Sequence, residues 1–330
     1  MNVEIQPNQA QKKWMKLGYG MFVHFGVNTF EGKSWGDGRF RPEQFDPSNL
    51  DPRQWAEVAV EAGMKYAVLT AKHVDGFCLW PSRHTEYSVK NSPRRPDVVH
   101  QFVDAFRAAG LEVGLYYSLW DRNFAQYDDD SAYAAYMQAQ IHELLTEYGP
   151  ILELWFDGGW DKEFPSREWP WKEDYRKSVA PDILAGGRWH WRELYNLIHR
   201  LQPECLVINN TSSDRPGIPR YFPVDVRTSE HYDFVWDDQV RVAVQDPVFR
   251  DDENRLVYLP LEFTTTLNTD WFYIPGKHVL HPSAATIADW YKRARECGAN
   301  LLLNMGPDHR GLVPEYHRPF LREARRRAEF

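Results

Sequence analysis

The sequence has little cysteine, no long apolar run and no stripe of basic charge, and each of these absences excludes a class of protein. The three cysteines, Cys78, Cys205 and Cys297, are an odd number without a CxxC pair, so neither a disulfide framework nor a zinc ribbon is indicated. No segment is apolar for long enough to span a bilayer, and the first residues lack the apolar core of a secretory signal. We therefore expect a soluble, cytoplasmic protein that does not bind membranes.

Several common ligand classes are also excluded. The formal net charge is -8, and acidic and basic side chains are interspersed along the chain, whereas a nucleic-acid backbone is bound by clustered Lys and Arg. The phosphate fingerprints GxGxxG and GxxxxGK[ST] do not occur, and neither does the GxSxG motif of serine hydrolases. The expected partner is neither a nucleic acid nor a dinucleotide.

Aromatic residues, by contrast, are abundant, at 15% of the chain with 14 Trp. Several tryptophans, Trp35 among them, fall in segments that are expected to be loops. Such side chains either roof loops and fill gaps or stack on the apolar face of a sugar ring.

Eight short apolar runs alternate with longer amphipathic stretches, the pattern of βα units around a parallel sheet. The expected strands are 19–26, 65–73, 112–118, 151–157, 205–210, 224–230, 261–268 and 300–307. The clearest helices run from Asp51-Pro52 to Gly63, from Pro96-Asp97 to Gly110, over 131–148, and from Ser283 to Gly298. The pattern predicts a (β/α)8 TIM-like barrel, α/β in class and irregular after the fifth and sixth strands, with residues 1–330 as one catalytic domain.

The carboxyl ends of barrel strands form the active face, and every expected strand here carries a polar residue at or near that end. These residues are His24, His73, Tyr117, Asp157, Asn210, Glu230, Asn268 and Asn304. Two carboxylates facing each other across a barrel mouth are what glycoside hydrolysis needs, because one attacks the anomeric carbon and the other protonates the leaving oxygen. Asp157 suits the attacking role, since Gly158 and Gly159 let the chain turn without crowding a ligand.

Metal-dependent hydrolysis is the main alternative on such a barrel. Metallohydrolases typically carry HxH on the first strand, whereas His24 stands alone in VHFG, and His73 and Asp75 lie across a turn without further ligands nearby. We expect neither a metal nor another cofactor.

Five stretches resemble successive motifs of glycoside hydrolase family 29, the retaining α-L-fucosidases, from about Trp14 to Glu315. They are WMKLGYGMFVHFGVNTF, FDPSNLDPRQWAEVAVEAGMKYAVLTAKHVDGFCLWPS, GLEVGLYYSLWD, LELWFDGGW and NLLLNMGPDHRGLVPE. The resemblance implies a metal-free retaining hydrolase that removes terminal α-L-fucose from oligosaccharides or glycoconjugates. It implies that Asp157 is the nucleophile and Glu230, in DVRTSE, the acid/base.

The resemblance also implies the sugar contacts His24, His73, Tyr117 and Trp155, to which we add Trp35 and Glu262 as further candidates. Asp214 and Glu262 remain alternatives for the acid. The departures from the family pattern are Val74 for a second histidine, Phe156 for a polar residue, Arg215 as an inexact match to an arginine, and no counterpart of the C-terminal β-sandwich.

These departures leave the catalytic pair intact but remove polar contacts around the sugar. A lost hydrogen bond to a substrate hydroxyl relaxes discrimination between sugars, so we expect fucose first and a related galacto-configured sugar, such as L-galactose or an arabinopyranoside, second. A sugar-binding barrel without turnover is the non-enzymatic alternative.

Overall fold

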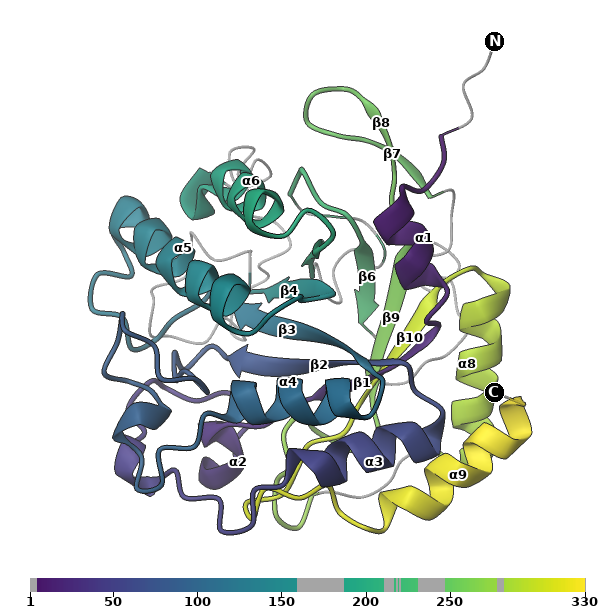
Figure 1. Ribbon diagram of the computed structural model, residues 1–330, viewed down its shortest axis with the longest axis horizontal. Coiled ribbons are helices and arrows are strands. Elements are labelled where there is room, and N and C mark those ends of the chain that lie inside the picture. Colours follow the sequence, from purple (N-terminus) through teal and green to yellow (C-terminus); the bar gives the residue numbers. More distant parts are fainter. Residues whose placement is uncertain are drawn as a thin grey trace, which may run out of the picture.

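The computed structural model describes residues 5–158, 187–210, 217, 219, 221–230, 247–277 and 282–329. Eight parallel strands form one sheet in the order β5-β4-β3-β2-β1-β10-β9-β6, and a parallel bridge between Ile208 and Val226 joins its two ends (Figure 1). The strands are β1 Tyr19–Val23, β2 Tyr66–Lys72, β3 Glu112–Ser118, β4 Glu153–Asp157, β5 Leu206–Asn209, β6 Arg227–Glu230, β9 Leu261–Thr266 and β10 Asn300–Asn304. The predicted eight-stranded barrel is confirmed.

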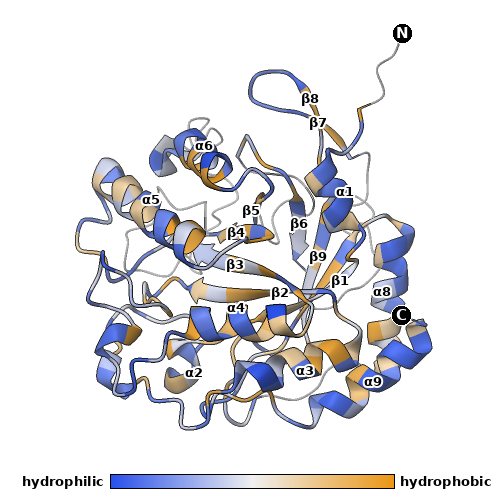
Figure 2. Ribbon diagram, in the orientation of Figure 1, coloured by the Kyte–Doolittle hydropathy of each residue, from blue (hydrophilic) through white to orange (hydrophobic). Residues whose placement is uncertain are grey.

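Helices lie against the outside of this barrel and across its amino-terminal end (Figure 1). They are α1 Gln9–Met15, α2 Val27–Glu31, α3 Pro52–Ala62, α4 Val98–Ala108, α5 Asp130–Glu147, α6 Trp191–Leu201, α8 Ala284–Glu296 and α9 His317–Ala328, with short 3₁₀ turns η1 Pro42–Gln44, η2 Val89–Asn91 and η6 Gly187–Trp189. Figure 2 shows apolar and polar residues on different faces of the helices, as expected for helices packed on a sheet. Helix α6 was not among the helices expected from the sequence, although its apolar residues Trp191, Leu194 and Ile198 share one helical face.

A two-stranded hairpin is the main departure from regular βα repetition. β7 Val248–Arg250 pairs antiparallel with β8 Leu256–Tyr258 between β6 and β9 in the chain, and the hairpin projects from the barrel (Figure 1). The described residues between β6 and β9 therefore form a hairpin and no helix, in line with the irregularity predicted after the sixth strand.

Side chains alternate between the inside and the outside of the barrel, because successive residues of a strand point to opposite faces. One buried cluster fills the interior and includes Phe22, Tyr116 and Trp155. The other lies between the sheet and the helices and includes Tyr117 and Phe156. Neighbours in register share a face, so Tyr116 pairs with Trp155 inside and Tyr117 with Phe156 outside.

An irregularity in β2 changes which side chains enter the barrel mouth. The register of β2 against β3 shifts between Thr70 and Lys72. Ala71 and Lys72 then both face outward, since Ala71 belongs to the outer cluster and Lys72 contacts the outward Tyr117. A bulge of this kind re-aims the following residues, and here it turns His73 inward.

The amino-terminal end of the barrel is closed by α1. The indole of Trp14 donates to the Glu153 carboxylate, and the Asn300 amide donates to the Trp14 carbonyl. Glu153 is fully buried, and a Cβ on the neighbouring Gly114 would lie 2.6 Å from its side chain, so only glycine leaves room there.

Two buried carboxylic acids, Glu153 and Glu262, lie inside the barrel near the amino-terminal ends of β4 and β9. Glu262 accepts from the hydroxyl of Tyr66 at 2.6 Å and from the indole of Trp155 at 2.9 Å. Burial raises the pKa of Glu262 to about 7, and burial together with Glu262 raises the pKa of Glu153. Both groups therefore hold a proton more tightly in the folded chain than in the unfolded one.

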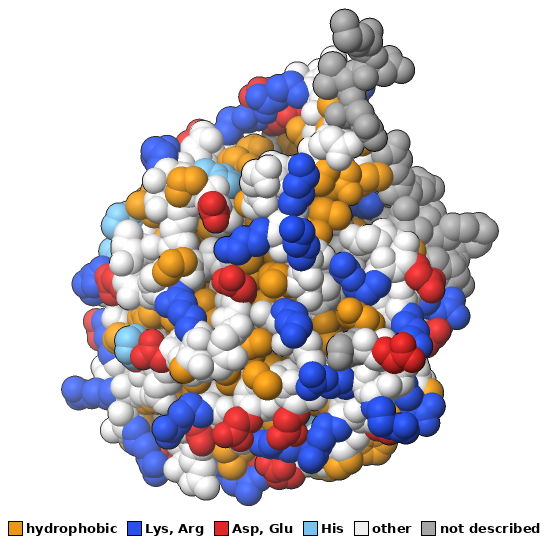
Figure 3. All heavy atoms as spheres, turned by 45° about the vertical axis from the view of Figure 1, so that its right-hand side comes forward, with side chains coloured by type: hydrophobic (Ala, Val, Ile, Leu, Met, Phe, Trp, Pro, Cys, Tyr) orange, Lys and Arg blue, Asp and Glu red, His pale blue; other side chains and the backbone are white. Residues whose placement is uncertain are grey.

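One face of the molecule carries mixed charge. Figure 3 shows Lys and Arg interspersed with Asp and Glu on this face. Among the described residues, no helix is long and apolar enough to cross a membrane.

Glu262→Gln should flatten the pH dependence of stability. A carboxyl whose folded pKa is raised costs no stability below the unfolded value near 4.5, and its cost grows until the pH passes about 7. The wild type should therefore lose stability between pH 5 and pH 8, and the variant should lose less, by on the order of 3 kcal/mol. Urea unfolding at several pH values measures this slope.

Glu43→Gln, at an exposed position of η1, is the matched control and should keep the wild-type slope. An unchanged slope in Glu262→Gln would show that Glu262 ionises normally.

Candidate active site

Asp157 ends β4 at the carboxyl end of the barrel and is held there by two neutral donors. The hydroxyl of Tyr116 donates to Oδ2 at 3.0 Å, and the amide of Asn210 donates to Oδ1 at 3.1 Å. Gly158 follows with φ +80°, and a Cβ there would lie 3.0 Å from the ring of Trp120, so the turn after Asp157 requires glycine. Gly159 and Trp160 lie outside the described residues.

Asn210 links Asp157 to Glu230 at the end of β6. Its Nδ2 donates to Glu230 Oε2 at 2.8 Å as well as to Asp157, while its Oδ1 accepts from the hydroxyl of Thr228 at 2.8 Å. The ionised Asp157 carboxylate fixes the orientation of the amide, because it only accepts and so requires the amide nitrogen on its side. The structure thus brings together the two carboxylates that the sequence analysis named.

The shared amide limits the distance between the two carboxylates. Their bonded oxygens can be no farther apart than the two hydrogen bonds laid end to end, about 6 Å. Retaining glycosidases place their carboxyl groups about 5 to 5.5 Å apart, and inverting ones about 6.5 to 9.5 Å. The geometry therefore fits the retaining class.

Electrostatics distinguishes the two carboxylates. Burial, followed by the charge of Asp157, raises the pKa of Glu230 to about 7. Burial also raises the pKa of Asp157, but hydrogen bonds from Asn210, Tyr116 and the Gly158 backbone oppose that rise. Glu230 therefore keeps a proton while Asp157 ionises. In a glycosidase, this difference makes Glu230 the general acid and Asp157 the nucleophile.

Two neutral histidines form the other side of the mouth. His24 follows β1 and its Nδ1 lies 2.8 Å from Asn304 Oδ1, while His73 follows β2 and its Nδ1 lies 3.1 Å from Asn28 Nδ2. Burial lowers the pKa of His24 to about 3, and burial followed by the charge of His24 lowers the pKa of His73. Both rings are therefore uncharged at neutral pH and offer hydrogen bonds without charge.

Aromatic side chains surround these polar groups. Tyr116 stacks on His73 with ring centroids 5.6 Å apart and on Trp155 at 5.7 Å, so it joins the histidine side to Asp157. The ring centroid of Trp35 lies 5.3 Å from that of His73, so this tryptophan borders the histidine side of the mouth. Trp271 and Phe272, after β9, lie 5.1 and 5.3 Å from His24.

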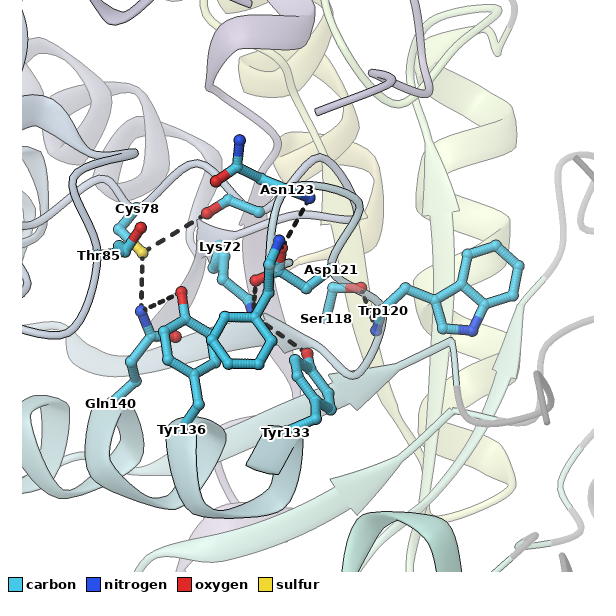
Figure 4. A network of polar contacts seen from close by, with 12 residues as sticks. Lys72, Cys78, Thr85, Ser118, Trp120, Asp121, Asn123, Tyr133, Tyr136 and Gln140 are labelled. Atoms are coloured by element: carbon cyan, nitrogen blue, oxygen red, sulfur yellow. Dashed lines mark hydrogen bonds and ion pairs between the residues drawn. The ribbon is translucent and has the colours of Figure 1, made fainter. Parts of the chain in front are cut away.

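The prediction that Tyr117 contacts the sugar is wrong. Tyr117 faces away from the mouth, where its hydroxyl donates to Gln140 at 2.6 Å and its ring covers Lys72 Nζ at 4.2 Å. Figure 4 shows this outer network, in which Lys72 is directed at Asp121 and Tyr133. Alternation along β3 places Tyr116 in the mouth instead.

Glu262 is also not a sugar contact in the structure. It is fully buried and accepts a hydrogen bond from the indole of Trp155, so it holds Trp155 in place on the side away from the mouth. Because it is enclosed, it cannot protonate a leaving group at the mouth. Phe156 faces outward against Trp191, with ring centroids 5.3 Å apart, so its departure from the family pattern does not alter the mouth. Val74 is buried in the outer cluster.

Other named residues have varied positions. Asn304 and Asn210 support the mouth, Asn268 is buried just beyond β9, and Asp214 and Arg215 lie outside the described residues. The sequence analysis missed Tyr116 and Asn28, together with Trp271 and Phe272. Strand alternation could have indicated Tyr116, whereas the other three depend on how α2 and the segment after β9 pack. Within the described part of the chain, no group of three or more His, Cys, Asp or Glu is placed to hold a metal ion.

A closed parallel barrel with two carboxylates that share one amide at its mouth defines the class of barrel glycosidases. The sequence model described as alpha-L-fucosidase matches residues 32–325. The chain belongs to the alpha-L-fucosidase family.

Individual relatives agree with this assignment. Alpha-L-fucosidase 1 of Arabidopsis thaliana is 31% identical over 314 residues, which cover 94% of this chain and 57% of that protein. The putative alpha-L-fucosidase 1 of Oryza sativa subsp. japonica is 33% identical over 325 residues, or 93% of this chain and 56% of that protein. The chain thus spans little more than half the length of these curated relatives.

Solved structures show the same fold. A glycoside hydrolase 29 family member from an unknown rumen bacterium is 33% identical with a TM-score of 0.75, covering 97% of this chain and 56% of that one. A putative alpha-L-fucosidase from Bacteroides thetaiotaomicron is 28% identical with a TM-score of 0.76, covering 98% and 68%.

Asn210→Ala should lower activity and move its pH profile upward. The amide hydrogen bonds lower the pKa of both carboxyls, so their loss should shift both limbs of the profile to higher pH. Hydrogen bonds to charged groups contribute about 1.5 to 3 kcal/mol, so kcat/KM on an aryl fucoside should fall about 10- to 100-fold. Initial rates from pH 4 to pH 9 measure both effects.

Asn209→Ala is the matched control, because Asn209 is the preceding residue of β5 and its buried amide faces the other way, with no hydrogen-bond partner among the described residues. It should keep the wild-type rate and profile. An Asn210→Ala profile that coincides with the wild type would contradict the role of the shared amide.

Proposed function

We propose that this protein is a retaining α-L-fucosidase that removes terminal α-linked fucose from oligosaccharides or glycoconjugates by double displacement. The observation that carries the proposal is the amide of Asn210, which keeps its two bonded oxygens of Asp157 and Glu230 no more than about 6 Å apart, below the separation of inverting enzymes. Membership of the alpha-L-fucosidase family supports the identity of the sugar.

In the first step, a carboxylate oxygen of Asp157 attacks the anomeric carbon and the bond from that carbon to the glycosidic oxygen breaks. Glu230 gives its proton to the departing oxygen, so the aglycone leaves as a neutral alcohol. A pKa of about 7 supports this role, because Glu230 is then protonated in much of the enzyme near neutral pH.

In the second step, Glu230 takes a proton from a water molecule whose oxygen attacks the anomeric carbon and releases Asp157. The ester on Asp157 carries no charge, so the contribution of Asp157 that raises the pKa of Glu230 is absent in the intermediate. Glu230 thereby becomes a better base at the stage that requires one, and the released sugar keeps its anomeric configuration.

The surrounding residues suit a deoxy sugar. His24 and His73 offer neutral polar contacts for hydroxyl groups, and Trp35, Trp271 and Phe272 supply an apolar wall. Fucose is the first expectation, with L-galactose or an arabinopyranoside as related galacto-configured substrates. Val74→His tests the sugar preference, since an unchanged ratio of rates on competing sugars would remove Val74 from its determinants.

Asp157→Asn should abolish turnover of an aryl α-L-fucoside, because the amide is a poor nucleophile and cannot form the ester. Added azide should restore part of the rate by attacking the anomeric carbon directly, and fucosyl azide should accumulate. Chromatography and mass measurement of the products give the readout. Fucose binding without turnover in the wild type would instead favour the sugar-binding barrel.

Glu230→Gln should slow aryl fucosides with poor leaving groups far more than activated ones. General acid catalysis typically contributes about 10² to 10⁴ in rate, and an activated phenol leaves without a proton. The wild-type kcat/KM should fall above about pH 7 as Glu230 ionises, and the variant should lack this alkaline limb. Equal losses on both substrate kinds, or a persisting limb, would reassign the acid.

A further inference from the structure

The two histidines of the mouth are held by asparagines that differ in the atom they present. Asn304 turns its oxygen toward His24 Nδ1, at 2.8 Å, whereas Asn28 turns its nitrogen toward His73 Nδ1, at 3.1 Å. An amide oxygen only accepts a hydrogen bond and an amide nitrogen only donates one. The two asparagines therefore favour opposite tautomers of the two rings, with the proton on Nδ1 in His24 and on Nε2 in His73.

The orientation of the Asn304 amide is fixed by its other contacts. Its Nδ2 donates to the Trp271 carbonyl at 2.8 Å and to the Thr266 hydroxyl at 3.0 Å. A backbone carbonyl has no proton to give, so the nitrogen must lie on that side and the oxygen must face His24. His24 Nδ1 then carries the proton, and its Nε2 is a bare acceptor.

The orientation of the Asn28 amide is fixed in the same way. Its Nδ2 lies 3.3 Å from the carbonyl of Ser34, which only accepts, and the same nitrogen has a second proton for His73 Nδ1. A reversed amide would place its oxygen against both the Ser34 carbonyl and the ring. His73 Nδ1 is therefore the acceptor, and Nε2 carries the proton.

The Nε2 atoms of both histidines are available to a ligand. Neither His24 Nε2 nor His73 Nε2 has a hydrogen-bond partner among the described residues, and both rings keep a small exposed fraction, 4% and 8%. The ring centroids lie 6.0 Å apart, close enough for two neighbouring hydroxyls of one sugar. Burial lowers the pKa of both rings, so neither is converted to a double donor at neutral pH.

We propose that Asn28 and Asn304 are positioning residues that hold His73 and His24 in opposite tautomers, so that the site selects two adjacent sugar hydroxyls of defined hydrogen-bond direction. One hydroxyl donates to His24 Nε2 and its neighbour accepts from His73 Nε2. The statement about sugar hydroxyls, the ligand half of this inference, rests on the proposed function. The statement about the two tautomers, the tautomer half, concerns the free protein.

The tautomers are measured directly by long-range ¹H–¹⁵N NMR of the histidine rings, assigned with His24→Gln and His73→Gln. The expected spectrum of the wild type at pH 7 shows the Nδ1–H form for His24 and the Nε2–H form for His73. The same tautomer for both rings, or a protonated ring at pH 7, would overturn the proposal. This readout needs no turnover, so it separates the inference from the activity.

Asn28→Asp tests the cause of the difference. A carboxylate at this position accepts only, so His73 Nδ1 should become protonated while the His24 signals stay in place. Asn91→Asp makes the same chemical change at an exposed position and should leave both rings as in the wild type. His73 signals unchanged in Asn28→Asp would show that Asn28 does not set the tautomer. The wild-type spectrum decides the first point even if this variant does not fold.

The ligand half is tested by competition with L-fucose and with monofluoro analogues in which each hydroxyl of an adjacent pair is replaced in turn. Fluorine cannot donate, so replacing the hydroxyl at His24 should weaken binding about 10-fold or more, whereas replacing its neighbour should cost about 3-fold or less. This difference should shrink in Asn28→Asp. Equal losses for every adjacent pair would overturn the assigned directions. No binding of L-fucose to the wild type would reject the sugar ligand together with the proposed function, and would leave the tautomer result standing.

Discussion

The alternation of side chains along the parallel strands is the constraint on which the rest of the site depends. Trp155 and Asp157 enter the barrel because they are two residues apart on β4, and Phe156 between them is excluded. The register of β3 against β4 then places Tyr116 beside Trp155, within reach of Asp157. The same rule sends Tyr117 outward to Lys72, so neighbouring tyrosines serve different parts of the molecule.

The second organising feature is that the carboxylate pair is held by neutral groups. Among the described residues, Asp157 and Glu230 have no Lys or Arg partner, and their hydrogen bonds come from Asn210, Tyr116 and the Gly158 backbone. A cation would hold both carboxylates ionised, whereas with a shared amide, burial, followed by the charge of Asp157, raises the pKa of Glu230 and keeps a proton on it. The histidines opposite are likewise neutral, so the mouth presents directed hydrogen bonds with little fixed charge.

Much of this arrangement could be predicted from the sequence, for physical reasons. The eight strands were predictable because each is a short apolar run that ends in a polar residue, and Asp157, Glu230, His24 and His73 were found because strand ends meet at one face of a barrel. Tyr117 was predicted wrongly because two tyrosines are adjacent near the end of β3, and only strand alternation distinguishes Tyr116, which points inward, from Tyr117, which points outward.

Other features could not have been read from the sequence. The bulge that turns His73 inward leaves no composition signal, since Thr70, Ala71 and Lys72 are ordinary strand residues. Helix α6 has the apolar spacing of a helix in Trp191, Leu194 and Ile198, but it has no side-chain cap and begins after His190 in a left-handed conformation, so it lacks a start signal. The contacts of Asn28, Trp271 and Phe272 depend on how α2 and the segment after β9 pack against the strand ends.

The measurement that tests the account most directly is the anomeric configuration of the first sugar released, followed by NMR during hydrolysis of an aryl α-L-fucoside. The spacing imposed by Asn210 predicts retention, so α-L-fucose should appear first and its β anomer only later by mutarotation. Initial release of β-L-fucose would mean that a water molecule fits between the carboxylates, and would contradict both the double displacement and the role of the shared amide.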